Sequence, residues 1–157
     1  MAKLQYLIIH CTATPAGREV SSDEIRRWHQ GAPPLGKGWK QVGYTDMFHL
    51  DGSRERLVDN NEDNNVDSWE ITNGVAGINS VSRYIVYVGG IGKDGKTPKD
   101  TRTAMQRKAM QKYVLDFVRR FPDAKVAGHN QFSVKACPSF NVPGWCREIG
   151  VPEENIY

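Results

Sequence analysis

Uninterrupted apolar runs along the chain predict strands in the interior of a sheet. The first run, from Leu4 to His10, is rich in β-branched and aromatic residues and shows no alternation at Leu7-Ile8-Ile9, which is typical of a strand covered on both faces. The run from Arg83 to Val88 predicts a second such strand, ended by two glycines. A third, short strand is predicted from Lys125 to Ala127.

A hairpin is predicted near the middle of the chain. The stretch from Trp39 to Leu50 predicts a strand, and Asp51-Gly52 indicates a tight turn after it. The stretch from Arg54 to Val58 then predicts the returning strand. The polar, Asn- and Asp-rich stretch that follows, residues 59–68, predicts a surface loop.

Apolar residues at helical spacing predict three helices. The longest runs from Thr101 to Phe121, and Pro122 stops it. A second, from Ser21 to Gln30, begins with a capping-box pattern in which Glu24 follows Ser21 by three residues. A short helical pattern covers residues 143–149. The apolar stripe of the longest helix consists of Met110, Tyr113, Val114, Phe117, Val118 and Phe121.

Predicted strands and helices alternate along the chain, and one connection is a hairpin. We therefore expect an α/β fold with a mixed central β-sheet flanked by helices. The 157 residues are enough to bury a core without disulfides, and we expect a single domain over residues 1–157.

Composition and charge narrow the class of protein. Hydrophobic residues make up 39% and charged residues 25% of the chain, as in water-soluble globular proteins. No apolar run approaches the roughly 20 residues of a membrane-spanning helix, and no secretory signal precedes the first strand. We expect cytoplasmic synthesis and no membrane insertion. The net charge of +3 comes from scattered basic residues, which argues against nucleic-acid binding and favours only adsorption to an anionic polymer.

The candidate chemistry lies in two places far apart in the sequence. His10 ends the first predicted strand, whereas His129, Lys135 and Cys137 lie within nine residues near the C-terminus. Because both histidines follow strand ends, they can meet at one edge of an open sheet. Two imidazoles and one thiolate are a sufficient ligand set for zinc, and three protein ligands leave a fourth position for water, as in catalytic sites. From spacing alone, zinc binding and ordinary structural roles both stay open.

The remaining cysteines and histidines are expected to be structural. Cys11 follows His10 on one strand, so its side chain faces the other side of the sheet, and we expect a small buried hydrophobe. The same is expected of Cys146 in the short helical pattern. His29 and His49 have no partner at ligand spacing and are expected to be structural or at the surface.

Four further segments are informative together, because of the order in which they follow one another along the chain. They are YLIIHCTAT at 6–14, WKQVGY at 39–44, VGGIG at 88–92 and GHNQFSVKACPSF at 128–140. The last ends in K-x-C-P-x-F behind an upstream histidine and is specific, whereas the others are weak singly. Together they resemble the zinc N-acetylmuramoyl-L-alanine amidases, which include the amidase-type bacteriophage lysozymes and the animal peptidoglycan recognition proteins. The resemblance covers about residues 4–145.

This resemblance implies the fold of the peptidoglycan recognition proteins and Zn²⁺ held by His10, His129 and Cys137. It also implies that Tyr44 and Lys135 assist hydrolysis of the amide that joins the lactyl group of N-acetylmuramic acid to L-alanine in bacterial peptidoglycan. The residue types suit that reaction, because a lysine ammonium beside a metal ligand stabilises an oxyanion and a phenol positions water or donates to the oxyanion. Without the resemblance, Lys135 is explained equally well as a solvated surface charge. Tyr44 is then explained equally well as a core aromatic residue whose hydroxyl reaches solvent.

The chain departs from the family near the cleft. Thr45 stands where many relatives have a histidine after Gly-Tyr, and residues 73–79 lack the histidine that bacterial and phage relatives often carry there. Ser82-Arg83-Tyr84 replaces the usual Ser-Ile-Gly. The expected ligands are retained, whereas contacts to substrate are expected to differ. The acidic stretch 59–69 is expected to be solvated.

Two other functions remain open. The missing cleft histidine favours a non-catalytic peptidoglycan-binding module of the same fold, although non-catalytic relatives typically lack the ligand that Cys137 provides. A Cys-His peptidase with Cys137 as nucleophile is disfavoured because Pro138 follows it. The small form resembles phage or prophage lysis enzymes, which reach the wall after membrane disruption, and a bacterial origin is also compatible. We expect a monomer.

Overall fold

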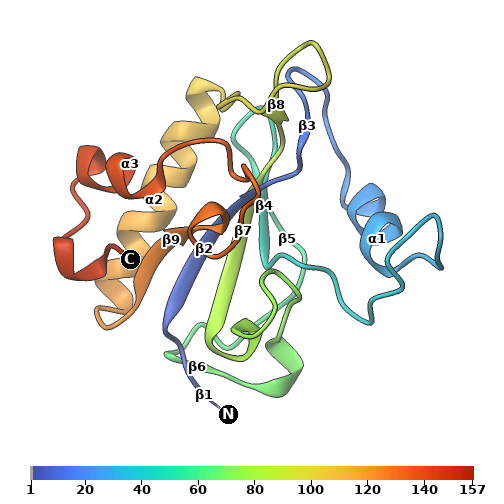
Figure 1. Ribbon diagram of the computed structural model, residues 1–157. Coiled ribbons are helices and arrows are strands. Elements are labelled where there is room, and N and C mark those ends of the chain that lie inside the picture. Colours follow the sequence, from blue (N-terminus) through green and yellow to red (C-terminus); the bar gives the residue numbers. More distant parts are fainter. Residues whose placement is uncertain (1) are drawn as a thin grey trace.

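Five strands form the central sheet of the computed structural model, which describes residues 2–157 (Figure 1). Their order across the sheet is β5-β4-β7-β2-β9. Four of them run parallel, and β5 is antiparallel to β4. The predictions of a mixed sheet and of an interior first strand are confirmed. The strands are β2 (Tyr6–Cys11), β4 (Asp46–Phe48), β5 (Arg54–Arg56), β7 (Ser82–Tyr87) and β9 (Lys125–Gly128).

Two pairs of short strands extend the ends of the sheet. The parallel pair is β3 (Thr14–Pro15) with β8 (Gly90–Ile91), and the antiparallel pair is β1 (Ala2–Lys3) with β6 (Asn65–Val66). The strand β6 lies in the stretch 59–68, for which the loop prediction is therefore wrong at this point. Its polar sequence carries no strand pattern, and it is a strand because its backbone pairs with the start of the chain.

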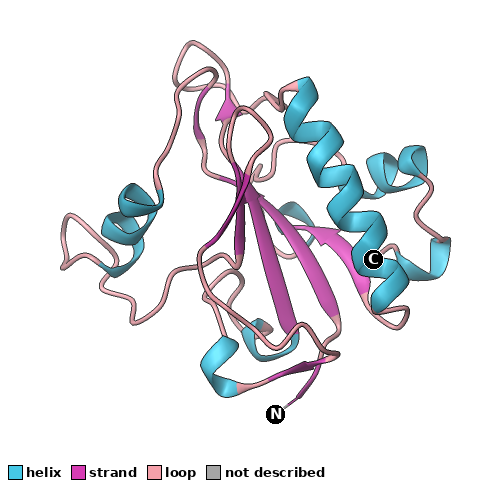
Figure 2. Cartoon of the chain, turned by 180° about the vertical axis from the view of Figure 1, so that it is seen from behind, coloured by secondary structure: helices cyan, strands magenta, loops and turns pink. Residues whose placement is uncertain are grey.

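Three helices flank the sheet, namely α1 (Ser22–Gln30), α2 (Ala104–Arg120) and α3 (Val142–Ile149). In both overall views α2 and α3 lie on one side of the sheet and α1 stands apart on the other (Figures 1 and 2). Within the described residues, none of the helices combines the length and the hydrophobicity needed to cross a membrane.

Local sequence signals define where the helices begin and end. The side chain of Ser21 accepts a hydrogen bond from the Glu24 amide, and the Glu24 carboxylate accepts one from the Ser21 amide, so the predicted capping box is present. Thr103 and Gln106 form the same motif at the start of α2. That helix ends before Pro122, as predicted.

Alternate residues of β2 enter different apolar clusters. Leu7 and Ile9 pack with α2 and α3 in the largest cluster of the molecule, whereas Ile8 packs with Tyr84 and Ala127 on the opposite face. This alternation follows from the period of two along a strand. His10 therefore shares its face with Ile8, the face that α2 and α3 do not cover.

The predicted hairpin forms, but its first strand is shorter than expected. Only residues 46–48 of the stretch 39–50 are a strand, so the strand prediction for 39–45 is wrong. The backbone of this segment bonds elsewhere: Trp39 N–H donates to the His29 carbonyl, and the Val42 carbonyl accepts from Asn73 N–H. These partners lie in α1 and in a distant loop, so the ladder of the sheet begins only at Asp46.

Candidate metal centre

His10 and His129 are brought together by the register of two neighbouring parallel strands. In the β2–β9 pair, Ile9 lies opposite Gly128, so the next residue along each strand is a histidine. The chain leaves β9 at once into a short 3-10 turn, η3 (His129–Gln131). The two imidazole centroids lie 4.4 Å apart. The sequence expectation that the histidines meet at one sheet edge is thus fulfilled geometrically.

Cys137 reaches the same point from a loop. Its Sγ accepts a hydrogen bond from the Cys11 amide at 3.2 Å and lies 3.7 Å from His10 Nδ1. The loop is tied to the sheet just beyond the cysteine, where the Tyr87 hydroxyl donates to the Pro138 carbonyl at 2.6 Å. The cysteine is therefore held by a hydrogen bond to β2, and the next residue of its loop by one to β7.

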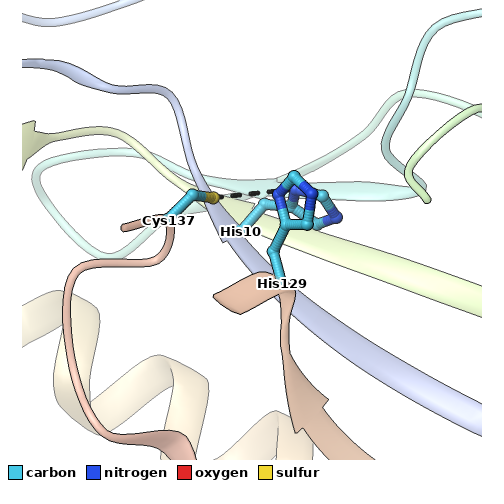
Figure 3. Close-up of side chains that lie close together, drawn as sticks. All are labelled: His10, His129 and Cys137. Carbon is cyan, nitrogen blue, oxygen red and sulfur yellow. Dashed lines mark hydrogen bonds between the residues drawn. The ribbon is translucent and has the colours of Figure 1, made fainter. Parts of the chain in front are cut away.

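The three side chains offer one ligand atom each within 4.8 Å of one another (Figure 3). His10 Nε2 and His129 Nδ1 are buried and have no hydrogen-bond partner among the described residues. A metal ion held between the three side chains would bind one nitrogen of each imidazole, and the His10 nitrogen beside Cys137 Sγ is Nδ1. Two nitrogens and one sulfur are ligands that suit zinc and leave a coordination position open. The residues present thus fit a zinc ion.

The electrostatics of the site favour neutral imidazoles. Burial, followed by the charge of His129, holds the pKa of His10 well below its ordinary value. Burial, followed by the charge of Lys135, lowers the pKa of His129. Both rings are therefore in the form that binds metals at neutral pH. A hydrogen bond with Cys11 and burial raise the pKa of the Cys137 thiol, and a bound cation would reverse that direction by favouring the thiolate.

Tyr44 and Lys135 border this cluster. The Tyr44 ring lies 5.2 Å from the His10 ring, centroid to centroid, and burial raises the pKa of its phenol. Lys135 is exposed, two residues before Cys137, and its charge lowers the pKa values of His10 and His129. His10, His129 and Cys137 therefore converge on the open face of the sheet with Tyr44 beside them, and Lys135 lies near enough for its charge to act on both imidazoles.

Several neighbours of the site were not expected to matter. Tyr84 is fully buried, and its ring lies edge-on to that of His10, with the centroids 5.4 Å apart. Its hydroxyl donates to Asn79 Oδ1 at 2.7 Å, which ties the loop 73–79 to the sheet. Tyr84 did carry a signal in the sequence, because Ser82-Arg83-Tyr84 replaces the usual Ser-Ile-Gly of the family. His29 also lies close, with its ring 5.1 Å from that of Tyr44, and its position on a helix gave no such signal.

The remaining predicted structural residues are placed as follows. Cys11 and Cys146 are buried in the large cluster against α2 and α3, as expected of small hydrophobes. His29 is buried, and His49 lies between two carboxylates, Glu19 at 2.8 Å and Glu55 at 2.9 Å. These histidines are structural rather than ligands of the cluster.

Comparison with known proteins places the chain among phage enzymes. No protein-family profile matches it. The endolysin of Enterobacteria phage K11 is 31% identical over 155 residues, which cover 94% of this chain and 93% of that endolysin. The match therefore extends over nearly the full length of both proteins.

Solved structures share the fold. The Ph2119 endolysin from a Thermus scotoductus bacteriophage matches with a TM-score of 0.71 at 26% identity and covers 97% of this chain and 88% of its own. The amidase LysC from Clostridium intestinale matches with a TM-score of 0.71 at 15% identity, covering 96% and 88%. Bumblebee PGRP-SA matches with a TM-score of 0.67 at 18% identity, covering 94% and 82%. The last two show the fold alone, and the fold expected from the sequence is confirmed. The chain belongs to the bacteriophage endolysins.

Proposed function

We propose that this endolysin hydrolyses the amide bond between the lactyl group of N-acetylmuramic acid and L-alanine, with Zn²⁺ held by His10, His129 and Cys137. Membership of the endolysins supports an action on the bacterial cell wall, and the fold shared with the amidase LysC supports cleavage of an amide. The metal, the bond cleaved and the roles of the residues are what we add. We further propose that it acts as a monomer on the cell wall once it has access to it.

One observation supports this proposal above the others. Three ligand atoms of types that zinc prefers converge within 4.8 Å, and the two imidazole nitrogens His10 Nε2 and His129 Nδ1 lack partners within the described part of the chain. The convergence carries the argument, because three ligand atoms of these types at one point are what a zinc site with an open coordination position requires. Bound zinc would supply an activated water molecule for attack on an amide carbonyl.

The residues around the cluster would each contribute a defined step. The exposed ammonium of Lys135 would approach the carbonyl oxygen of the substrate and stabilise the negative charge that develops there. Tyr44 keeps its proton because burial raises the pKa of its phenol, so it would donate a hydrogen bond to that oxygen or orient the attacking water. The Cys11 amide would hold Cys137 Sγ in place through its hydrogen bond.

The test is release of stem peptides from purified peptidoglycan, read by mass spectrometry with and without a zinc chelator. We expect peptides that begin with a free L-alanine amine, lost on chelation and restored by added zinc. Cys137→Ala should abolish both zinc binding and release. Cys146→Ala is the matched control, because this buried cysteine of α3 lies in the core and not among the ligands, and it should retain both.

Three results would contradict the proposal in different ways. Release that resists chelation but is lost on thiol alkylation would indicate that Cys137 is a nucleophile. Bound peptidoglycan without any release would indicate a receptor. Release of fragments with a different new end would show that another bond is cut.

A further inference from the structure

The segment that carries Tyr44 is hydrogen-bonded to a histidine outside the metal cluster. His29 lies in the last turn of α1 and is buried, with 7% of its surface exposed. Its Nδ1 accepts a hydrogen bond from the Gly43 amide at 2.9 Å. Because Gly43 directly precedes Tyr44, this bond fixes the backbone from which the Tyr44 side chain projects.

The same imidazole also packs against the Tyr44 ring. The centroids of His29 and Tyr44 lie 5.1 Å apart, and those of Tyr44 and His10 lie 5.2 Å apart. Trp39 contacts His29 from another side, at 4.9 Å between centroids. Tyr44 is therefore in contact with one imidazole of the metal cluster and with a second imidazole that belongs to α1.

On the C-terminal side of Tyr44 the backbone is attached to the sheet, because Thr45 N–H donates to the Tyr84 carbonyl at 2.9 Å. The Gly43 amide precedes the paired residues of β4, which begin at Asp46, so its bond to His29 holds the N-terminal side. The neighbouring bond, from Asn73 N–H to the Val42 carbonyl, comes from a loop. The contact is also close: a Cβ at position 43 would lie 3.2 Å from His29 Cε1 and 3.0 Å from the Asn73 carbonyl oxygen. Glycine at position 43 thus allows the imidazole to approach the backbone.

The protonation state of His29 suits an acceptor. Burial, followed by the charge of Lys37, lowers its pKa from 6.5 to about 4. At neutral pH the ring is uncharged, and its Nδ1 lone pair is free to accept the Gly43 N–H. A protonated imidazole has no acceptor and would break this contact.

We infer that His29 is a positioning residue for Tyr44: it sets the place of the phenol over the metal cluster through the Gly43 amide and through ring packing. This inference rests on the role proposed for Tyr44. His29 does not touch the ligand atoms, so it would influence the rate of hydrolysis and leave zinc affinity unchanged.

Three substitutions at position 29 separate the hydrogen bond from the bulk of the ring. His29→Asn keeps an acceptor at the same distance from Cβ, because Asn Oδ1 and His Nδ1 are both bonded to Cγ. His29→Gln moves the acceptor one bond further out, and His29→Phe keeps a ring without an acceptor. We expect His29→Phe and His29→Gln to lower kcat on a soluble muropeptide by about 10- to 100-fold with little change in KM. His29→Asn should recover most of that loss.

The decisive measurement is a double-mutant cycle with Tyr44→Phe. If His29 acts through the phenol, His29→Phe should lower kcat by less than about threefold once the phenol is gone. Zinc content and zinc affinity should stay at the wild-type level in every variant, which also reports that each is folded. His49→Phe is the control, because that histidine pairs with Glu19 and Glu55 and should leave kcat unchanged.

Each contrary outcome has its own meaning. Three outcomes would overturn the positioning role and leave the amidase proposal intact. The first is a double variant in which the two losses of kcat multiply fully. The others are equal losses in His29→Asn and His29→Phe, and loss of zinc in all three position-29 variants. Full activity of Tyr44→Phe would instead remove the proposed role of Tyr44, and the role of His29 with it. Should His29→Phe not fold, the contrast between His29→Asn and His29→Gln still decides.

Discussion

Neighbouring residues of β2 point to opposite faces of the sheet, where they serve different roles. Leu7 and Ile9 point toward α2 and α3 and belong to a large apolar cluster in which every member is buried. Ile8 and His10 point to the other face, where the apolar cluster is small and one buried nitrogen on each of the two proposed ligand histidines has no hydrogen-bond partner among residues 2–157. One face is dominated by a large apolar cluster, whereas the other carries a group of possible metal ligands gathered at one place.

This contrast shows how the fold separates stability from chemistry. A strand alternates its side chains between faces, so one short segment can contribute to a closed core and to an open site at once. Unsatisfied buried groups reduce stability, and the large cluster on the other face offsets that cost. On the open face, the convergence of two imidazoles and one thiol therefore marks where a ligand is expected.

The largest effect on activity is expected from removing a proposed zinc ligand on the open face of the sheet. We expect His129→Ala to lose bound zinc and to reduce hydrolysis to background, because two protein ligands remain where three are needed. The zinc-free variant should be no less stable than zinc-free wild type, since the substitution removes a buried nitrogen without a partner. Metal analysis together with denaturant unfolding in chelator would check both. Retained zinc with wild-type activity would show that the site lies elsewhere.

A smaller loss of activity is expected from Lys135→Ala. If its ammonium stabilises the oxyanion, kcat should fall by about 10²–10³-fold, whereas zinc affinity and thermal stability should change little because the side chain is exposed. Lys135→Arg should recover part of the rate through its charge. Steady-state kinetics on a soluble muropeptide would measure this. A Lys135→Ala enzyme with unchanged kcat would show that this lysine is an ordinary surface charge.

On the packed face, Ile9→Val should show the reverse behaviour. Ile9 is fully buried, so deleting one methylene is expected to cost about 0.5–1.5 kcal/mol in the free energy of unfolding. Zinc affinity and kcat at a temperature well below the unfolding transition should match wild type. Unfolding in urea and parallel kinetics would report both. A fall in zinc affinity out of proportion to the loss of stability would mean that the two faces are coupled.

The parts of the fold that the sequence predicted well are those whose own pattern carries the information. The interior strands and α2 have apolar residues at the right period, and the meeting of His10 with His129 follows from parallel neighbours ending at one edge. The segment 39–45 was predicted wrongly because its backbone bonds to α1 and Asn73, and such contacts leave no trace in local periodicity.

The same distinction between local sequence pattern and tertiary contact applies to the residues of the site. The ligand types and their positions after strands allowed a metal cluster but left structural roles open, whereas Tyr44 and Lys135 stood out only through the resemblance to a family. His29 was assigned a structural role, because nothing in a helical histidine reveals that its Nδ1 will meet the Gly43 amide. Predicting that contact requires the arrangement of α1 against the segment 39–45, which is a property of the folded chain.

The last effect we expect concerns stability alone: a change of stability with pH that originates at His29, on the open side of the sheet. Its pKa is lowered from 6.5 to about 4 by burial and then by Lys37, so the unfolded chain takes up a proton near pH 6.5 and the folded chain only near pH 4. The free energy of unfolding should therefore fall as the pH decreases through this window, and the contribution of His29 should be constant above it. His29→Asn cannot take up this proton, so the stability advantage of wild type over this variant should shrink between about pH 7 and about pH 4.5. Urea unfolding of both proteins in chelator would measure the difference, and the other titrating groups are common to both. An advantage that stays constant across this range would show that His29 is not held as a buried neutral acceptor, and that the open face is less protected from water than its packing indicates.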